Sequence, residues 1–411
     1  MSTSTSHRPV TTTASTAWIL GLCLITAVLE GVDLQSTGVA APRIAHEFGL
    51  SVGQMGLAFS AGMLGLFPGA MIGGRLADKI GRKRVLLLSM ILFGVFSIFT
   101  AMVWSFPSLL IARVLTGLGL GGAMPNLIAL SAEAVAPKRR NTAVSIMYCG
   151  MPFGGAVAAL IGVLSAGETA WRNIFYTGGI APLVVVPLLM FLMPESRAFE
   201  TESAVAQGKV AEPEPTLRVL FGGGRAGATL QVWLSFFCTL IVLYFLLNWL
   251  PSLIVSRGLS HAQAGITQIF FNTGSVIGVL AIGILMDRVK PGLVVLAVYV
   301  GIIASLVALS GAADMSSLSI SVLFAGMFVV GAQGMLYALA AACYRTEIRG
   351  TGVGAAVAVG RLGSIVGPLA AGQLLSVGKS ASTVIGASVP VTVIAAIAAL
   401  LAVRHAIASK G

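Results

Sequence analysis

Long apolar stretches run through the whole sequence, and they narrow the possible folds more than any other feature. We count twelve runs of about 20 predominantly apolar residues, the length that an α-helix needs to cross the hydrocarbon core of a bilayer. Inside lipid the backbone must satisfy its own hydrogen bonds, as a helix does within one segment. The sequence therefore predicts an all-α integral membrane protein with twelve transmembrane helices. They are expected near residues 17–41, 55–77, 84–103, 108–132, 142–166, 173–193, 229–254, 262–286, 292–312, 316–341, 350–377 and 381–404.

The distribution of Lys and Arg predicts how these spans are oriented. Only 9% of the residues are charged, whereas soluble domains carry about 25%. Of the 25 Lys and Arg residues, 19 fall in the tails and the even-numbered connections, four fall in the other loops, and two lie within spans. Positive residues gather on the cytoplasmic side of membrane proteins. Both termini are therefore expected in the cytoplasm, and the net charge of +11 needs no nucleic acid partner.

One polar stretch divides the spans six and six. Residues 194–228 contain five glutamates and three prolines, so we expect a cytoplasmic linker there. The predicted organisation is a disordered tail at 1–16, a six-helix half at 17–193, the linker at 194–228, a second six-helix half at 229–404 and a short tail at 405–411.

Two loops of the first half return in the second half at the same spacing. The sequence GRLADKIGRKR, which begins at Gly74, is matched in part by GILMDRVKP, which begins at Gly283, 209 residues later. Arg140 and Thr142 return as Arg349 and Thr351, again 209 residues later. The shared spacing indicates a duplicated six-helix unit. Parallel repeats of this kind place a substrate site between the halves, near the middle of the membrane.

Two acids lie inside the first predicted span. A carboxylate at mid-bilayer costs about 2.5–3.5 kcal/mol on insertion scales, and Glu30 and Asp33 share one helix face. They fit either a structural ion pair with a neighbouring helix or a proton-binding site, and we favour the second. Arg113 lies at a depth that suits pairing with Asp33. Arg361 lies near the level of Glu30, across the expected cavity, where its planar fork suits a substrate carboxylate; either arginine could instead only hold helices together.

Polar and aromatic residues also gather in the spans around this level. Each of them alone also fits a structural role, but together they suit an aromatic ring that bears a hydroxyl group. The candidate substrate-binding residues beside Arg361 are Tyr148, Asn248, Trp249, Asn272, Gln333 and Tyr337.

The sequence offers little support for enzymatic chemistry. Gly117, Gly119 and Gly122 match a dinucleotide-binding pattern, but no strand precedes them. We find no phosphate-binding loop, nucleophile triad or metal-ligand cluster, so no cofactor is expected.

Several motifs resemble one transporter family. GRLADKIGRKR and RVLTGLGLGG resemble signature patterns of the major facilitator superfamily, and EGVD at Glu30 is similar to the DGxD motif of its aromatic acid:proton symporters, with Glu30 at the first Asp. LEGVDLQSTGVAA and MYCGMPFG resemble bacterial 3-(3-hydroxyphenyl)propionate transporters. The resemblance implies the major facilitator fold and a monomer of the bacterial inner membrane that imports a small aromatic carboxylate with protons.

The resemblance also implies a gating role for the cytoplasmic loops. Glu133 fits two roles equally well, a gating partner of the basic loop and a solvated residue at a helix end. The candidate gating residues are Gly74, Asp78, Gly81, Arg82, Lys83, Glu133, Asp287 and Arg288.

Two other functions are consistent with a twelve-helix chain. Proton-coupled efflux of apolar compounds usually goes with a Gly-Pro-x-x-Gly-Gly pattern in the fifth span, whereas here the proline follows Gly150 by two residues. A membrane sensor of aromatic acids is the remoter alternative, because no signalling domain is recognisable in the sequence.

Overall fold

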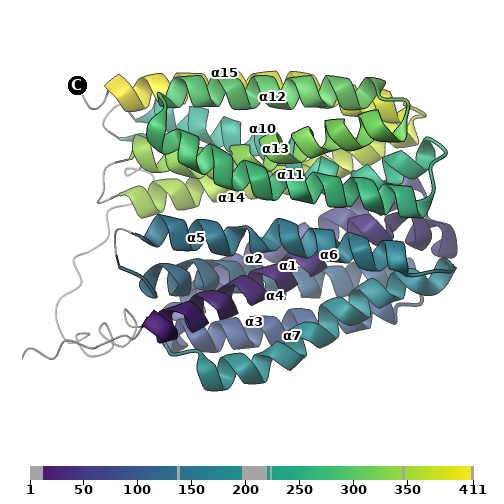
Figure 1. The fold of residues 1–411 in the computed structure, drawn as a ribbon, viewed down its shortest axis with the longest axis horizontal. Helices are drawn as coiled ribbons and strands as arrows, with labels where there is room; N and C mark the ends of the chain where they lie inside the picture. The colour runs from purple at the N-terminus through teal and green to yellow at the C-terminus, as the bar shows by residue number, and fades with distance from the viewer. Residues whose placement is uncertain (1–12, 137–138, 197–219, 223–224, 345–347, 409–411) are drawn as a thin grey trace, which may run out of the picture.

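The computed structural model describes residues 13–136, 139–196, 220–222, 225–344 and 348–408. Within these residues all regular structure is helical, and twelve helical spans are long and apolar enough to cross a membrane. Figure 1 shows them as two stacked groups. The first group comprises α1 (Thr13–Phe48), α2 (Val52–Ile80), α3 (Arg82–Ala101), α4 (Phe106–Glu133), α5 (Arg140–Tyr148), α6 (Gly150–Leu164), the 3-10 helix η2 (Glu168–Trp171) and α7 (Arg172–Leu192). The second comprises α10 (Ala226–Ser256), α11 (His261–Arg288), α12 (Pro291–Gly311), α13 (Met315–Cys343), α14 (Arg349–Ser376) and α15 (Ala381–Ala408).

The predicted number of spans is confirmed, and the first and fifth spans differ most from the prediction. The first helix is longer than the predicted span 17–41, because it begins in the predicted tail and continues past Pro42 to Phe48. The fifth span is divided, since α5 ends at Tyr148 and α6 begins at Gly150. Pro152 has no N–H to donate to the carbonyl group of Tyr148, which explains a break at this point. Residues 1–12 of the tail and most of the linker lie outside the described residues.

The repeat in the sequence is a repeat in the structure. Five helices of the second group begin 209 residues after their counterparts: α11 after α2, α12 after α3, α13 after α4, α14 after α5 and α15 after α7. The N-caps repeat as well, because Ser51 and Ser260 cap α2 and α11, and Ser105 and Asp314 cap α4 and α13. Hydrogen bonds from the backbone and side chain of Ser317 hold the pKa of Asp314 below its ordinary value.

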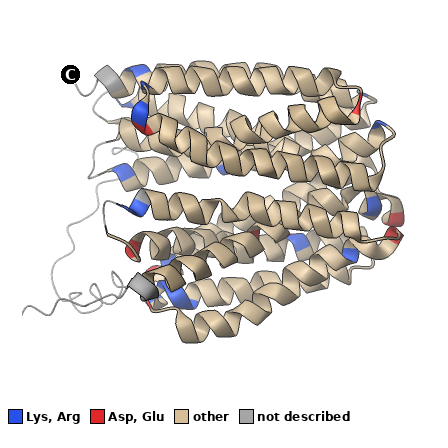
Figure 2. Cartoon of the chain, in the orientation of Figure 1, with Lys and Arg blue, Asp and Glu red and all other residues tan. Residues whose placement is uncertain are grey.

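Both described chain ends lie at one end of the bundle, which we call the termini end; the other is the far end (Figure 1). Figure 2 shows Lys and Arg gathered mainly at the termini end, while the long middle of the helices carries little charge. Such an asymmetry is expected of a membrane protein, in which Lys and Arg gather on the cytoplasmic side.

Glycines allow the helices of each half to pack backbone to backbone. A Cβ on Gly65 of α2 would collide with the carbonyl oxygen of Val114 on α4, and a Cβ on Gly274 of α11 would collide with that of Leu323 on α13. Gly65 and Gly274 are again 209 residues apart. Small residues at such contacts let transmembrane backbones approach closely, so the same seam stabilises both halves.

The two halves meet near the far end. There Phe59 of α2 packs edge-on against Trp249 of α10, with ring centroids 5.0 Å apart. Ser60 of α2 donates a hydrogen bond of 2.9 Å to the carbonyl of Ile365 on α14. Gly265 of α11 lies against Ala159 and Val163 of α6. These contacts close the interface at the far end and leave room for a cavity nearer the termini end.

Candidate functional site

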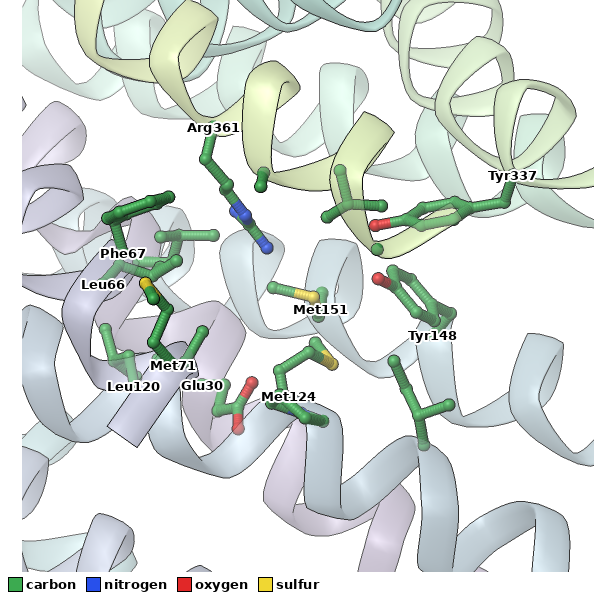
Figure 3. A pocket seen from close by; sticks show the side chains of 18 of the residues that line it. Glu30, Leu66, Phe67, Met71, Leu120, Met124, Tyr148, Met151, Tyr337 and Arg361 are labelled. Carbon is green, nitrogen blue, oxygen red and sulfur yellow. The ribbon is translucent and has the colours of Figure 1, made fainter. Parts of the chain in front are cut away.

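A cavity of about 360 Å³ lies between the two halves (Figure 3). This volume is within the range of small-molecule sites. Its lining comes from both halves, and most of it is apolar. The residues that line it are Glu30, Leu34, Leu66, Phe67, Ala70, Met71, Leu120, Gly121, Met124, Pro125, Ile128, Tyr148, Met151, Tyr244, Tyr337, Gly354, Val357, Ala358 and Arg361.

Arg361 brings a guanidinium group to the cavity from α14. Its Nη1 donates a hydrogen bond of 2.8 Å to the hydroxyl oxygen of Tyr244 on α10. No other hydrogen bond or ion pair to the guanidinium group of Arg361 is found within the described residues, and the rest of its fork faces the cavity. A fixed guanidinium fork of this kind matches a carboxylate bidentately.

Glu30 lies on the opposite side of the cavity, on α1 (Figure 3). Only 2% of this residue is exposed, and Oε1 has no hydrogen-bond partner within the described part of the chain. Burying a carboxylate without partners is costly unless it is neutralised or paired. Glu30 is therefore a buried acid that lines the cavity without a neutralising contact to its Oε1 among the described residues.

Asp33, one turn further along α1, is placed differently. Its Oδ1 accepts a hydrogen bond of 2.9 Å from Nη1 of Arg113 on α4, and both side chains are almost fully buried. The Arg113 guanidinium also lies 5.7 Å from the ring centroid of Phe175. The expected pairing of Asp33 with Arg113 is confirmed, and neither residue lines the cavity.

A pair of tyrosines stands at the edge of the cavity nearer the termini end. Tyr148 is the last residue of α5 and Tyr337 belongs to α13, so the pair joins the two halves. Their ring centroids are 6.3 Å apart, and Phe236 packs edge-on against Tyr337 at 5.5 Å. The break after Tyr148 also turns Met151 of α6 toward the cavity (Figure 3).

Four of the expected substrate-binding residues do not line the cavity. Asn248 donates to the backbone carbonyl of Tyr244, one turn earlier in α10. Trp249 donates to the carbonyl of Pro368 on α14 and packs against Phe59. Asn272 takes part in an amide cluster between the halves, and Gln333 is half-buried elsewhere on α13. The polarity of these residues identified buried positions, but not which way each one faces.

The amide cluster is a feature that sequence reasoning missed. Gln35 of α1 exchanges hydrogen bonds of 2.9 Å with Asn272 of α11 and accepts one of 2.8 Å from Gln268. All three are buried, and a side chain at position 155 would overlap the amide of Gln35, where Gly155 leaves space. The signal in the sequence was Gln35 in one apolar span and Gln268 and Asn272 in another, because an amide is expensive to bury without a partner.

The apolar residues of the cavity were missed as well. Phe67, Met71, Met124 and Met151 line it, but in an almost wholly apolar span nothing distinguishes a cavity residue from one that faces lipid. Methionine is flexible and contacts aromatic rings favourably, so these walls suit a ring of variable substitution.

Three of the predicted gating residues of the first half, Arg82, Lys83 and Glu133, take part in a network at the termini end. Arg82 of α3 and Glu133 of α4 make an ion pair, and Glu133 also accepts a hydrogen bond of 2.7 Å from Ser196. The carboxylate of Glu195 accepts one of 2.8 Å from the backbone N–H of Lys83. Of the two alternatives left open for Glu133, the structure shows the contact with the basic loop, and the gating role of that contact stays a prediction.

The other predicted gating residues are in more open positions. Gly81 joins α2 to α3 with φ +101, a left-handed conformation that favours glycine, and a Cβ there would overlap Glu195. Among the residues that the structure describes, the rest have no direct partner; Gly74 is half-buried, while Asp78, Asp287 and Arg288 are exposed. Their gating role stays a prediction.

Comparisons with known proteins agree with this arrangement. Residues 23–368 match the Major Facilitator Superfamily. The chain is 47% identical to the 3-(3-hydroxyphenyl)propionate transporter of Escherichia coli (strain K12), over 96% of either protein. It is 35% identical to the gallate transporter of Pseudomonas putida, over 90% of this chain and 88% of that protein. The xylose transporter XylE from E. coli shares the fold, with a TM-score of 0.75 at 18% identity over 93% of this chain and 95% of XylE.

Proposed function

The chain belongs to the major facilitator superfamily, among its transporters of aromatic acids, and from this premise we propose that it imports a hydroxylated phenylpropionate or a related aromatic acid together with protons. It is a multi-pass protein of the bacterial inner membrane and a transporter, not an enzyme. The observation that carries the proposal is the placement of one cation, Arg361, and one unpartnered acid, Glu30, in a single cavity between the halves.

Arg361 binds the substrate carboxylate in this proposal. Tyr244 occupies one donor of the fork and holds its orientation, so a carboxylate can enter without a search over side-chain conformations. The methionine and leucine walls take the apolar ring. An aromatic acid therefore satisfies both the charged and the apolar parts of the lining.

Glu30 carries the coupling proton. An ionised Glu30 and a substrate carboxylate in the same cavity would repel each other. Binding of the anion thus favours protonation of Glu30, and release of the anion favours loss of that proton. Asp33, which Arg113 already neutralises, holds α1 against α4 and supports this exchange from outside the cavity.

Uptake into proteoliposomes tests the proposed function. We expect purified protein to accumulate labelled 3-(3-hydroxyphenyl)propionate when the outside is acidic, and an uncoupler to abolish that accumulation. Accumulation that persists with the uncoupler would refute proton coupling. Proton-coupled movement of apolar compounds, without uptake of any aromatic acid, would instead identify an efflux protein.

A further inference from the structure

Tyr148 and Tyr337 hold two phenol groups at one end of the cavity, and each comes from a different half of the protein. We propose that this pair recognises the ring hydroxyl of the substrate and so sets the preference for hydroxylated over unsubstituted aromatic acids. The inference rests on the proposed function, because it assumes that an aromatic carboxylate occupies this cavity.

The two hydroxyl groups are positioned for such recognition. Figure 3 shows both rings side by side with their hydroxyl ends turned toward the interior of the cavity, on the side of Arg361 and Met151. The rings are tilted by 58° to each other and their hydroxyl groups share a hydrogen bond, so the two phenols form one polar group at this edge of the cavity. Phe236 supports the ring of Tyr337 from the other side and limits its movement.

The third tyrosine of the cavity has a different task. The hydroxyl oxygen of Tyr244 accepts the hydrogen bond from Arg361. It is thereby committed to the carboxylate end of the site. Among the tyrosines of the lining, this leaves Tyr148 and Tyr337 to meet the other end of a bound acid.

The spacing between the pair and Arg361 suits a phenylpropionate. α5 and α14 begin at the equivalent residues Arg140 and Arg349. Tyr148 lies eight residues into α5 and Arg361 twelve residues into α14, so their backbones differ by four residues, or about 6 Å along the bundle. With its carboxylate on Arg361, an acid with a short linker can direct its ring toward the tyrosines.

Phenol groups suit the recognition of another phenol. Each hydroxyl can donate one hydrogen bond and accept another, so two of them can satisfy both the donor and the acceptor capacity of a ring hydroxyl. The two tyrosine hydroxyls are hydrogen-bonded to each other, so a ring without a hydroxyl leaves that pair as it is and gains nothing from it, whereas a ring hydroxyl adds hydrogen bonds to it. Because the pair spans the two halves, a ring hydroxyl placed there is also bound by both halves at once.

Matched substrates and isosteric variants test the proposal. The variants are Tyr148→Phe and Tyr337→Phe, which keep the rings and their packing, and the ligands are 3-(3-hydroxyphenyl)propionate and 3-phenylpropionate, titrated into purified protein by calorimetry. We expect each variant to bind the hydroxylated acid about three- to tenfold more weakly, the range for one neutral hydrogen bond, and to bind 3-phenylpropionate as the wild type does. Tyr244→Phe is the control, because it loosens Arg361 and should weaken both acids alike.

The possible failures are distinct. If the wild type binds neither acid, the proposed function itself is wrong. If the wild type binds both acids equally well, or if the tyrosine variants weaken both acids by the same factor or neither, aromatic acid transport stands and recognition of the hydroxyl by this pair is refuted.

Discussion

Glu30 and Asp33 are separated by one turn of α1, yet their surroundings differ. Each acid has one carboxylate oxygen without a partner among the described residues, but the other oxygen of Asp33 is paired with Arg113 at 2.9 Å, whereas Glu30 faces the cavity. The sequence predicted both as proton-coupling residues, and that role stays a prediction for each. The contacts nevertheless distinguish an acid that lines the cavity from one that is ion-paired outside it.

The first prediction concerns these two acids. Glu30→Gln should abolish uphill accumulation of the aromatic acid while substrate exchange down its gradient continues, because an amide binds no coupling proton. Glu30→Asp should retain part of the accumulation, since a carboxylate remains. The measurement is uptake with and without a pH gradient.

Asp33→Asn is the matched comparison. It leaves Arg113 buried without its counter-ion, and breaking a buried pair costs about 3–5 kcal/mol. We therefore expect a less stable protein, with transport reduced in proportion to the folded amount. If Asp33→Asn folds normally and loses only the uphill component, while Glu30→Gln retains it, the roles are reversed.

Arg361 is the subject of the second prediction. A hydrogen bond to a charged group contributes about 1.5–3 kcal/mol, so Arg361→Ala should weaken binding of the aromatic acid roughly ten- to a hundredfold. Arg361→Lys keeps the charge without the fork and should fall between Arg361→Ala and the wild type. Normal binding by Arg361→Ala in a calorimetric titration would show that the carboxylate lies elsewhere.

At the scale of the elements, the close backbone contacts of α2 with α4 and of α11 with α13 explain how a duplicated sequence maintains two similar halves.

The third prediction is that Gly274→Ala lowers the melting temperature of the purified protein. Its Cβ would meet the backbone of Leu323 rather than a flexible side chain, and overpacking costs about 1–3 kcal/mol. Gly386→Ala is the control, because nothing lies near a Cβ at that position and alanine favours the helix. Equal melting temperatures for both variants would contradict the role of the seam.

The elements also show what sequence alone could predict. Twelve spans, their repeat and the pairing of Asp33 with Arg113 followed from apolar length, shared spacing and depth. The cavity lining did not, because the rotation of each helix about its axis depends on its neighbours when nearly every face is apolar. Asn248, Trp249 and Asn272 were assigned by polarity, but the structure uses them to tie helices and halves together. The break after Tyr148 had a signal in Pro152, because a proline cannot donate the helical hydrogen bond to the carbonyl group four residues earlier, whatever its surroundings.

For the molecule as a whole, the orientation in the membrane is the fourth prediction. The excess of Lys and Arg at the termini end indicates that this end is cytoplasmic. A reporter inserted in the linker between residues 197 and 219 should therefore be active only in the cytoplasm, and one placed after Lys379 only outside. The opposite pattern would place the cavity opening on the outer side.

The opposite charges of Arg361 and Glu30 have an electrical consequence, which is the fifth prediction. An empty cavity with both groups ionised is neutral, and so is a cavity that holds one anionic substrate and one protonated Glu30. A cavity with only the anion or only the proton carries an unbalanced charge, which is expensive to move through the membrane interior. One proton should thus cross with each anion, and uptake should respond to a pH gradient but not to a membrane potential. Vesicles with a potassium diffusion potential and equal pH on both sides provide the measurement, and voltage-driven accumulation there would show that more than one proton accompanies each acid.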